Sequence, residues 1–247
     1  MATADDHFLV LGAGGLGCPA LLGLVAGGAR SLTIVDRDRV DASNLHRQVL
    51  YDLGDVGARK VEAARARLLA RDPALTIRPL ELDLDGDALP RLLADAPPRT
   101  IVLECSDGPD LKFMTNDLCV ARGVPAVIGG VIRWRGQAHA VAHGGACMRC
   151  VYEEAPPAGL SEPCAAVGVI GSAAGFVGHL MAHLALALAH DRASIAGTLV
   201  VADLLRMQAR ELRPLPRPGC LACAGRGIDP TATSRSACPS RTIAAPP

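Results

Sequence analysis

The stretch that decides the fold is Phe8-Leu-Val-Leu-Gly-Ala-Gly-Gly-Leu-Gly17, close to the beginning of the chain. Its first four residues are apolar and predict a short buried strand over 8–11. Glycines follow at the spacing G-x-G-x-x-G, and the apolar residues after them predict a helix to about Ala26. Glycine allows the tight turn, the approach of a phosphate to backbone amides, and contact between helix and strand. The stretch predicts a nucleotide-binding turn formed by Gly12, Gly14, Gly15 and Gly17.

The second strand of this unit ends at an acid. Residues 32–35, L-T-I-V, predict a strand and are followed by Asp36, about 20 residues after the glycine turn. At that place a carboxylate can accept hydrogen bonds from both ribose hydroxyls, and the helix N-terminus offers free N–H groups to a phosphate. The alternative is a glycine-rich turn without a ligand, but motif, strands and acid occur in register. Taken alone, this βαβ unit favours NAD over ATP.

Strand and helix patterns alternate along the rest of the chain. Helices are expected over 55–71, 88–95 and 110–122, and strands over 76–80, 100–104, 125–129, 137–142 and 197–203. This order predicts an α/β fold with a Rossmann-like, doubly wound, mainly parallel sheet. We expect one domain over 1–223, with a nucleotide-binding half at 8–130 and a second half at 131–223. Residues 224–247 are rich in Gly, Ser, Thr and Pro and are expected to be a disordered tail.

The residues after Asp36 make the pattern more specific. They run R-D-R-V-D-A-S-N-L-H-R-Q to position 48, and Gly57, Lys60, C-S-D at 105–107 and two C-x-x-C pairs follow. In this order and spacing, the chain resembles the ThiF/MoeB/HesA family of ubiquitin-activating-enzyme-like adenylyltransferases over residues 8–223. The resemblance implies an enzyme that uses ATP and Mg²⁺. Its substrate would be the C-terminal glycine of a small ubiquitin-like sulfur-carrier protein, of the ThiS or MoaD type, that ends in Gly-Gly.

The resemblance also implies roles for polar residues. Adenylating a carboxylate requires cations around a triphosphate and a ligand for a metal. Arg47 and Lys60 would contact the phosphates as catalytic groups, and Asp107 would hold Mg²⁺ at the end of its strand. The same pocket would be lined by Ser43, Asn44, Gln48 and Gly108. From the residues alone, Arg47 and Lys60 could equally be solvated surface side chains, and Asp107 could cap the helix expected at 110.

Four of the nine cysteines form two pairs, Cys147-Met-Arg-Cys150 and Cys220-Leu-Ala-Cys223. Two such pairs can supply the four thiolates of a tetrahedral structural zinc site. The 69 residues between the pairs exceed the usual zinc-ribbon gap, but the resemblance implies this long gap. A redox dithiol or unrelated buried thiols are the alternatives. Zinc here would hold the C-terminal segment against the core.

The other cysteines divide into two groups. Cys164 lies between the pairs and matches a family cysteine that can form a thioester or persulfide link with the carrier protein. Its alternative role is that of a small residue where a loop meets a helix. Cys18, Cys105 and Cys119 fall in expected core elements and are interpreted as packed thiols. Cys238 lies in the expected tail and is interpreted as a free thiol.

The chain departs from the family pattern in several places. Seven residues precede Phe8, where related bacterial enzymes have a helical arm whose arginine reaches the ATP site of the partner subunit. Gly108 replaces a usual asparagine, Lys112 replaces a usual arginine, and the segment after Cys164 looks shortened. These differences bear on rate and on the choice of partner. By the resemblance we expect a homodimer, and a separate sulfur donor because no rhodanese-like domain is recognised.

Three other functions stay open at this point. One is a non-catalytic scaffold that keeps the fold and the zinc and only binds a carrier protein. Another is an NAD-dependent oxidoreductase with a structural zinc, although S-N-L-H-R-Q at 43–48 has no role in that chemistry. The third is a relative that activates a peptide or a tRNA-linked carboxylate.

Composition argues against two classes of partner. Lysine plus arginine and aspartate plus glutamate are balanced at 25 each, so no global field attracts nucleic acid or an anionic membrane. Residues 165–189 have no Asp, Glu, Lys or Arg and are long enough for a membrane helix. Their glycines and histidines, and the lack of basic or aromatic flanks, favour a buried helix instead. No export signal is recognised, so a cytoplasmic location is expected.

Overall fold

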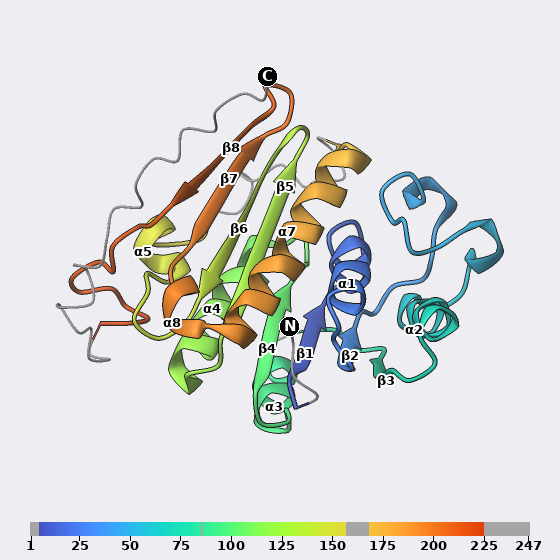
Figure 1. The fold of residues 1–247 in the computed structure, drawn as a ribbon, viewed down its shortest axis with the longest axis horizontal. Coiled ribbons are helices and arrows are strands. Elements are labelled where there is room, and N and C mark those ends of the chain that lie inside the picture. Colours follow the sequence, from blue (N-terminus) through green and yellow to red (C-terminus); the bar gives the residue numbers. More distant parts are fainter. Residues whose placement is uncertain (1–4, 85, 157–167, 225–247) are drawn as a thin grey trace, which may run out of the picture.

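A single eight-stranded sheet runs through the computed structural model, which describes residues 5–84, 86–156 and 168–224 (Figure 1). The strand order is β3-β2-β1-β4-β5-β6-β7-β8. Strands β1 to β5 pair in parallel, and β5 to β8 pair antiparallel. The expected Rossmann-like, mainly parallel sheet is confirmed, with an antiparallel half added beyond β5. The strands are β1 His7–Leu11, β2 Ser31–Val35, β3 Thr76–Leu80, β4 Thr100–Glu104, β5 Ala126–Ile132, β6 Arg135–Val141, β7 Leu199–Asp203 and β8 Gln208–Leu212.

Helices cover both faces of this sheet and bury a separate core on each (Figure 1). Because side chains alternate along a strand, Phe8 of β1 packs with α1, α2 and α7, whereas Leu9 packs with α3 and α4. The longer helices are α1 Gly17–Ala26, α2 Lys60–Arg71, α3 Ala88–Ala94, α4 Pro109–Arg122 and α7 Gly171–His190. Shorter elements are α5 Met148–Tyr152, α8 Arg192–Ile195 and the 3₁₀ turns Ala42–Asn44 and Leu53–Asp55.

Helix α7 is long and apolar enough to cross a membrane, judged by its length and composition. In this fold it packs against α1 and against β4, β5 and β6. Two glycines allow the close approach, because a Cβ on Gly129 would overlap Met181 and a Cβ on Gly178 would overlap Pro19. These contacts agree with the interpretation of this segment as a buried helix.

The helix expected over 55–71 begins later, at Lys60, so the expected start was wrong. Gly57 has a φ of +88°, which a continuing α-helix does not accommodate. Its N–H donates to the Val40 carbonyl at 2.9 Å, and the N–H of Lys60 donates to the Asp38 carbonyl at 3.0 Å. This pairing with a distant segment keeps 57–59 out of the helix. It also places Lys60 in the first turn of α2, beside the end of β2.

Strand β8 was not expected from the sequence. Its residues are all exposed, so no alternation of buried and exposed positions marks it. It forms by antiparallel pairing with β7, from Leu199 opposite Leu212 to Asp203 opposite Gln208. This edge strand extends the antiparallel half of the sheet and supplies side chains to a cavity described below.

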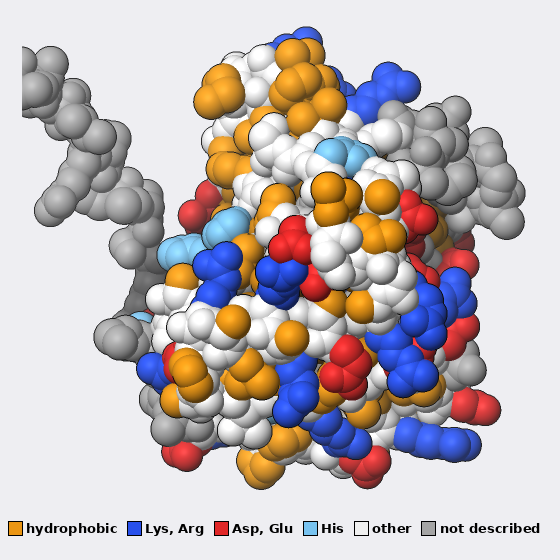
Figure 2. All heavy atoms as spheres, turned by 90° about the vertical axis from the view of Figure 1, so that its right-hand side faces the viewer, with side chains coloured by type: hydrophobic (Ala, Val, Ile, Leu, Met, Phe, Trp, Pro, Cys, Tyr) orange, Lys and Arg blue, Asp and Glu red, His pale blue; other side chains and the backbone are white. Residues whose placement is uncertain are grey.

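Basic and acidic side chains alternate over the face that carries α2 and the segment 37–59 (Figure 2). Many of them form exposed ion pairs with each other, so this face presents no field of a single sign. The pairs include Arg37 with Asp83, Arg59 with Glu81, and Arg67 with Asp52.

Candidate functional site

The glycine turn between β1 and α1 is held in one conformation by its neighbours. Gly12 has a φ of +95°, and a Cβ on Gly17 would overlap the Gly12 carbonyl oxygen. The N–H of Ala13 donates to Asp36 Oδ2 at 2.7 Å. The hydroxyl of Tyr51 donates to the Ala13 carbonyl at 2.8 Å. These contacts preorganise the start of α1, whose free N–H groups are suited to a phosphate.

Gly17→Ala is expected to lower the free energy of unfolding by about 1–3 kcal/mol, because the added methyl has no space in the turn. Urea unfolding measures this change. Gly175→Ala in α7 is the matched control, since an added Cβ there meets nothing within 4 Å. The control is expected to be neutral or to stabilise by about 0.5–1 kcal/mol. Equal effects of the two substitutions would contradict the packing described for the turn.

A cavity of about 570 Å³ opens where β1, β2 and β4 end, next to the glycine turn. That volume lies within the range of small-ligand pockets. Its walls include Gly12, Gly14 and Gly15, and the apolar side chains Val35, Leu82 and Leu84. The polar residues expected from the sequence that do line it are Asp36, Asn44, Arg47, Gln48, Lys60 and Asp107. Side chains far apart in the chain therefore converge on one cavity.

Lys60 is a buried cation at the side of this cavity. The residue is only 5% exposed, so the surface interpretation of this lysine was wrong. Its ammonium donates to Asp38 Oδ2 at 2.7 Å and lies 3.9 Å from Asp36 Oδ1. The two carboxylates hold the ammonium in place, and the cavity gives it access to a negatively charged ligand.

Gln48 offers a second observation that points to a polar ligand. The residue is 3% exposed and lines the cavity, and its Oε1 has no hydrogen-bond partner within the described ranges. A buried polar atom of this kind is normally satisfied, so a ligand or water is expected beside it. Its neighbour Arg47 lies along the glycine turn, where a Cβ on Gly15 would be 3.5 Å from Arg47 Cδ.

Asp107 is exposed at the carboxyl end of β4 and lines the cavity. Helix α4 begins at Pro109 after Gly108, and no side chain caps it. The helix-cap interpretation of Asp107 was therefore wrong. Among the residues the structure describes, the Asp107 carboxylate has no hydrogen-bond or ion-pair partner, which leaves both oxygens available to a cation.

Three other candidates lie outside the cavity wall. Ser43 is exposed, and its hydroxyl donates to Asp41 Oδ1 at 2.5 Å, so this side chain serves a local turn. Gly17 is buried at the start of α1, and Gly108 precedes α4. Their roles in the described structure are conformational.

The two cysteine pairs meet in a cluster despite their separation in sequence. The four sulfur atoms lie within 4.8 Å of one another. Individual separations are 3.8 Å for Cys147 and Cys150, 3.6 Å for Cys147 and Cys220, and 3.4 Å for Cys150 and Cys223. Sulfur atoms that share a tetrahedral zinc ion are about 3.8 Å apart. The cluster therefore fits a metal ion.

Burial and hydrogen bonds act in opposite directions on the ionisation of thiols in this cluster. The pKa of the Cys147 thiol is raised to about 11, chiefly by burial. Burial opposes ionisation of Cys220 as well, but N–H groups of Cys223 and Ala222 and neighbouring thiols donate to it and lower its pKa to about 7. The Arg217 N–H reaches the Cys150 sulfur at 3.3 Å. Four crowded thiols can all ionise only with a metal ion between them.

The remaining cysteines follow the sequence interpretation as far as the structure describes them. Cys18, Cys105 and Cys119 are buried, which confirms them as packed thiols. Burial raises the pKa of Cys18 to about 12, so it is unreactive at neutral pH. Cys164 and Cys238, and the expected tail after Ala224, lie outside the described residues.

A buried ion pair, which the sequence did not indicate, lies at the border of the cavity. Glu104, at the end of β4, is fully buried, and Lys112 of α4 donates to its Oε2 at 2.6 Å. Lys112 also donates to the Ser106 carbonyl at 2.7 Å. The pair fixes the β4–α4 connection that carries Asp107.

Fold and site together are those of an α/β protein with a glycine-turn cavity suited to a nucleotide and a cysteine cluster that fits a metal ion. The model of the ThiF family matches residues 3–222. The chain therefore belongs to the ThiF family.

Curated relatives are similar over most of their length. The SAMP-activating enzyme E1 of Haloferax volcanii is 35% identical over 226 residues, 91% of this chain and 83% of that protein. The sulfur carrier protein adenylyltransferase of Thermus thermophilus is 37% identical over 230 residues, 90% of this chain and 83% of that protein. The molybdopterin-synthase adenylyltransferase of Salmonella typhimurium is 36% identical over 225 residues, 90% of this chain and 88% of that protein.

Solved structures share the fold. The crystal structure of E. coli MccB with AMPCPP and MccA superimposes with a TM-score of 0.75 at 18% sequence identity. The match covers 90% of this chain and 67% of that chain. At this identity the likeness supports the architecture of the sheet and its helices.

Proposed function

We propose that this protein is an ATP-dependent adenylyltransferase. Its substrate is the C-terminal glycine carboxylate of a small ubiquitin-like sulfur-carrier protein of the ThiS or MoaD type. The observation that carries the proposal is the convergence of Lys60, Arg47 and Asp107 on one cavity beside the glycine turn. The relatives, which are named as adenylyltransferases for a sulfur carrier and for molybdopterin synthase, support the choice of reaction.

The reaction joins the substrate carboxylate to the α-phosphate of ATP. A carboxylate oxygen attacks the α-phosphorus, the bond from that phosphorus to the bridging oxygen breaks, and pyrophosphate leaves. The product is an acyl adenylate, and no proton is transferred. The site has to neutralise the charge that builds up on the phosphates, which fixed cations do best when they are already in place.

Each residue of the site has a task in this reaction. The glycine turn and the start of α1 bind a phosphate through backbone N–H groups. Asp36 binds the ribose hydroxyls, Lys60 and Arg47 bind the phosphates, and Asn44 and Gln48 complete the pocket. Asp107 would hold Mg²⁺, which supplies positive charge to the triphosphate.

The proposal has five further parts. The cysteine cluster holds zinc and stabilises the C-terminal segment. The protein acts in the cytoplasm as a homodimer, and a separate protein donates the sulfur. Cys164 is a candidate acceptor: its thiol would lose its proton to water, the thiolate would attack the acyl carbon, AMP would leave, and a thioester would form.

Carrier-dependent exchange of pyrophosphate into ATP tests the proposed function. Zinc-loaded protein is mixed with candidate carriers that end in Gly-Gly, and wild type is compared with Arg47→Ala and Asp107→Ala. Wild type is expected to exchange, and each variant is expected to lose at least about a hundredfold. ATP binding without exchange, for every carrier, would indicate the scaffold instead. NAD binding without exchange would indicate the oxidoreductase, which has no use for Lys60, Arg47 and Asp107.

If the four cysteines bind zinc, the purified protein is expected to contain about one zinc ion per chain, which metal analysis measures. Cys220→Ser is expected to lose the metal and to lower the melting temperature, because the ion joins the two cysteine pairs across the fold. Cys18→Ser is a suitable control, since Cys18 is buried at the start of α1 and is not part of the cysteine cluster. Full zinc content in the Cys220 variant would contradict the assignment.

A further inference from the structure

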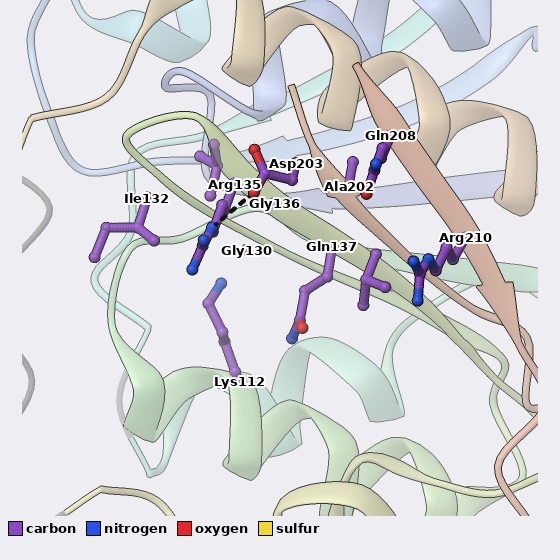
Figure 3. Close-up of a pocket in the computed structure, with 12 residues that line it drawn as sticks. Lys112, Gly130, Ile132, Arg135, Gly136, Gln137, Ala202, Asp203, Gln208 and Arg210 are labelled. Carbon is purple, nitrogen blue, oxygen red and sulfur yellow. Dashed lines mark hydrogen bonds and ion pairs between the residues drawn. The ribbon is translucent and has the colours of Figure 1, made fainter. Parts of the chain in front are cut away.

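A second cavity, of about 560 Å³, lies on the antiparallel half of the sheet (Figure 3). It shares Lys112, Gly130 and Val131 with the cavity beside the glycine turn, which we call the nucleotide cavity, so the two are neighbours with a common wall. At Gly130 a Cβ would meet only the Gln137 side chain, at 3.9 Å. The absence of a side chain there leaves open space beside the shared wall.

The floor of this cavity is a straight row of residues across four strands. Gly130 of β5 lies opposite Gln137 of β6, Gln137 opposite Val201 of β7, and Val201 opposite Arg210 of β8. Directly opposed residues point to the same face, and all four residues line the cavity. We call them the Gly130 row. It leads from the edge of the nucleotide cavity to the outer strand of the sheet.

The charges along the cavity are compensated except at its outer end. Lys112 is paired with Glu104, and Asp203 accepts from both Arg135 and Arg206. The Arg210 side chain is exposed and, within the described part of the chain, has no hydrogen-bond or ion-pair partner. In Figure 3 Arg210 extends from β8 on the far side of Gln137 from Lys112. A free guanidinium at the end of an otherwise neutral trough is suited to a carboxylate.

We propose that Arg210 is a specificity-determining residue that binds an acidic side chain in the C-terminal tail of the substrate. The inference rests on the proposed function, because it places the terminal glycine of that tail at Gly130. The tail lies extended over the Gly130 row, with small or flexible residues beside Gly130 and a carboxylate at Arg210. No bond is made or broken at Arg210, and its role is selection of the substrate.

The sheet itself sets the distance of this contact. Neighbouring strands are about 4.8 Å apart, so three steps along the row span about 14 Å. An extended chain covers that distance with about four residues. With the terminal residue at Gly130, the residue that faces Arg210 is the fifth from the carboxyl end. The reach of the arginine side chain allows one position on either side.

Tail variants of one carrier protein test this distance. Five variants of a small ubiquitin-like carrier ending in Gly-Gly are prepared. Each has a single glutamate at one of the five positions from the third to the seventh residue from its end, and alanine at the other four. KM for the carrier is measured in pyrophosphate exchange. The lowest KM is expected with glutamate at the fifth residue, about threefold to fivefold below the all-alanine tail, as for a partly exposed ion pair.

Charge reversal makes the test specific to Arg210. In the Arg210→Glu variant, KM is expected to be no lower for the tail with glutamate at the fifth residue than for the all-alanine tail. A tail with lysine at that residue is expected to have the lowest KM instead, with kcat unchanged. Arg213→Glu is the matched control, because Arg213 is exposed, pairs with Glu211 and lies outside the cavity wall. A KM that is the same for all tails, or an equal effect of the two reversals, overturns the inference while leaving the proposed function standing. Absence of exchange by wild type with every carrier overturns both.

Discussion

Replacement of Lys60 by methionine is expected to lower kcat/KM for pyrophosphate exchange by about 10²- to 10³-fold. Lys60 is 5% exposed, and its ammonium is held 2.7 Å from Asp38 at the wall of the nucleotide cavity. A cation fixed in a site with little water stabilises developing charge more strongly than a solvated one. Methionine keeps the length of the side chain and removes the charge, so the variant isolates the electrostatic contribution.

Arg59→Ala is the control for this substitution. Arg59 directly precedes Lys60, but its side chain is 53% exposed and pairs with Glu81 at 2.9 Å on the outside of the fold. Exchange by this variant is expected to stay within about twofold of wild type. If Lys60→Met lost no more activity than Arg59→Ala, Lys60 would have no part in binding the phosphates.

The second large effect is expected at Glu104, where alanine should lower the free energy of unfolding by about 3–5 kcal/mol. Glu104 is fully buried, and its Oε1 accepts the Ser106 N–H at 3.0 Å while Oε2 binds Lys112. Removal of the carboxylate leaves the Lys112 ammonium largely buried without its partner, which costs far more than an exposed pair. Urea unfolding measures the change.

Two further variants separate this effect from general damage. Glu81→Ala removes a carboxylate from the exposed pair with Arg59 and is expected to cost less than about 1 kcal/mol. Glu104→Met combined with Lys112→Met removes both buried charges and is expected to recover part of the lost stability. A loss at Glu104 as small as that at Glu81 would contradict a buried ion pair.

Local patterns were enough to predict the nucleotide-binding half of the fold. The apolar run at 8–11, the glycine spacing and Asp36 are close in sequence, and each reports a local requirement of the turn. The start of α2 and the whole of β8 could not be predicted in this way. Residues 57–59 pair with 38–40 across a gap in the sequence, and β8 exists because β7 offers it an edge.

The residues of the site also divide into those that local sequence patterns predict and those that depend on contacts seen only in the folded structure. Motif order was sufficient to find Arg47, Gln48, Lys60 and Asp107, which line the cavity. Ser43 belongs to the same motif, but its side chain is used by Asp41, and sequence alone does not show such a local bond. The Glu104–Lys112 pair depends on how the connection from β4 to α4 folds, and the Gly130 row depends on strand register, so both become visible only when the structure is known.

The measurement that tests the central claim most directly follows the α-phosphate of ATP. The protein is incubated with Mg²⁺, a Gly-Gly-ending carrier and ATP labelled in its α-phosphate, and the carrier is then isolated rapidly. We expect label on the carrier, and none on a carrier whose terminal carboxylate is amidated. A carrier that stays free of label, or equal labelling of the amidated carrier, would contradict adenylation of the C-terminus.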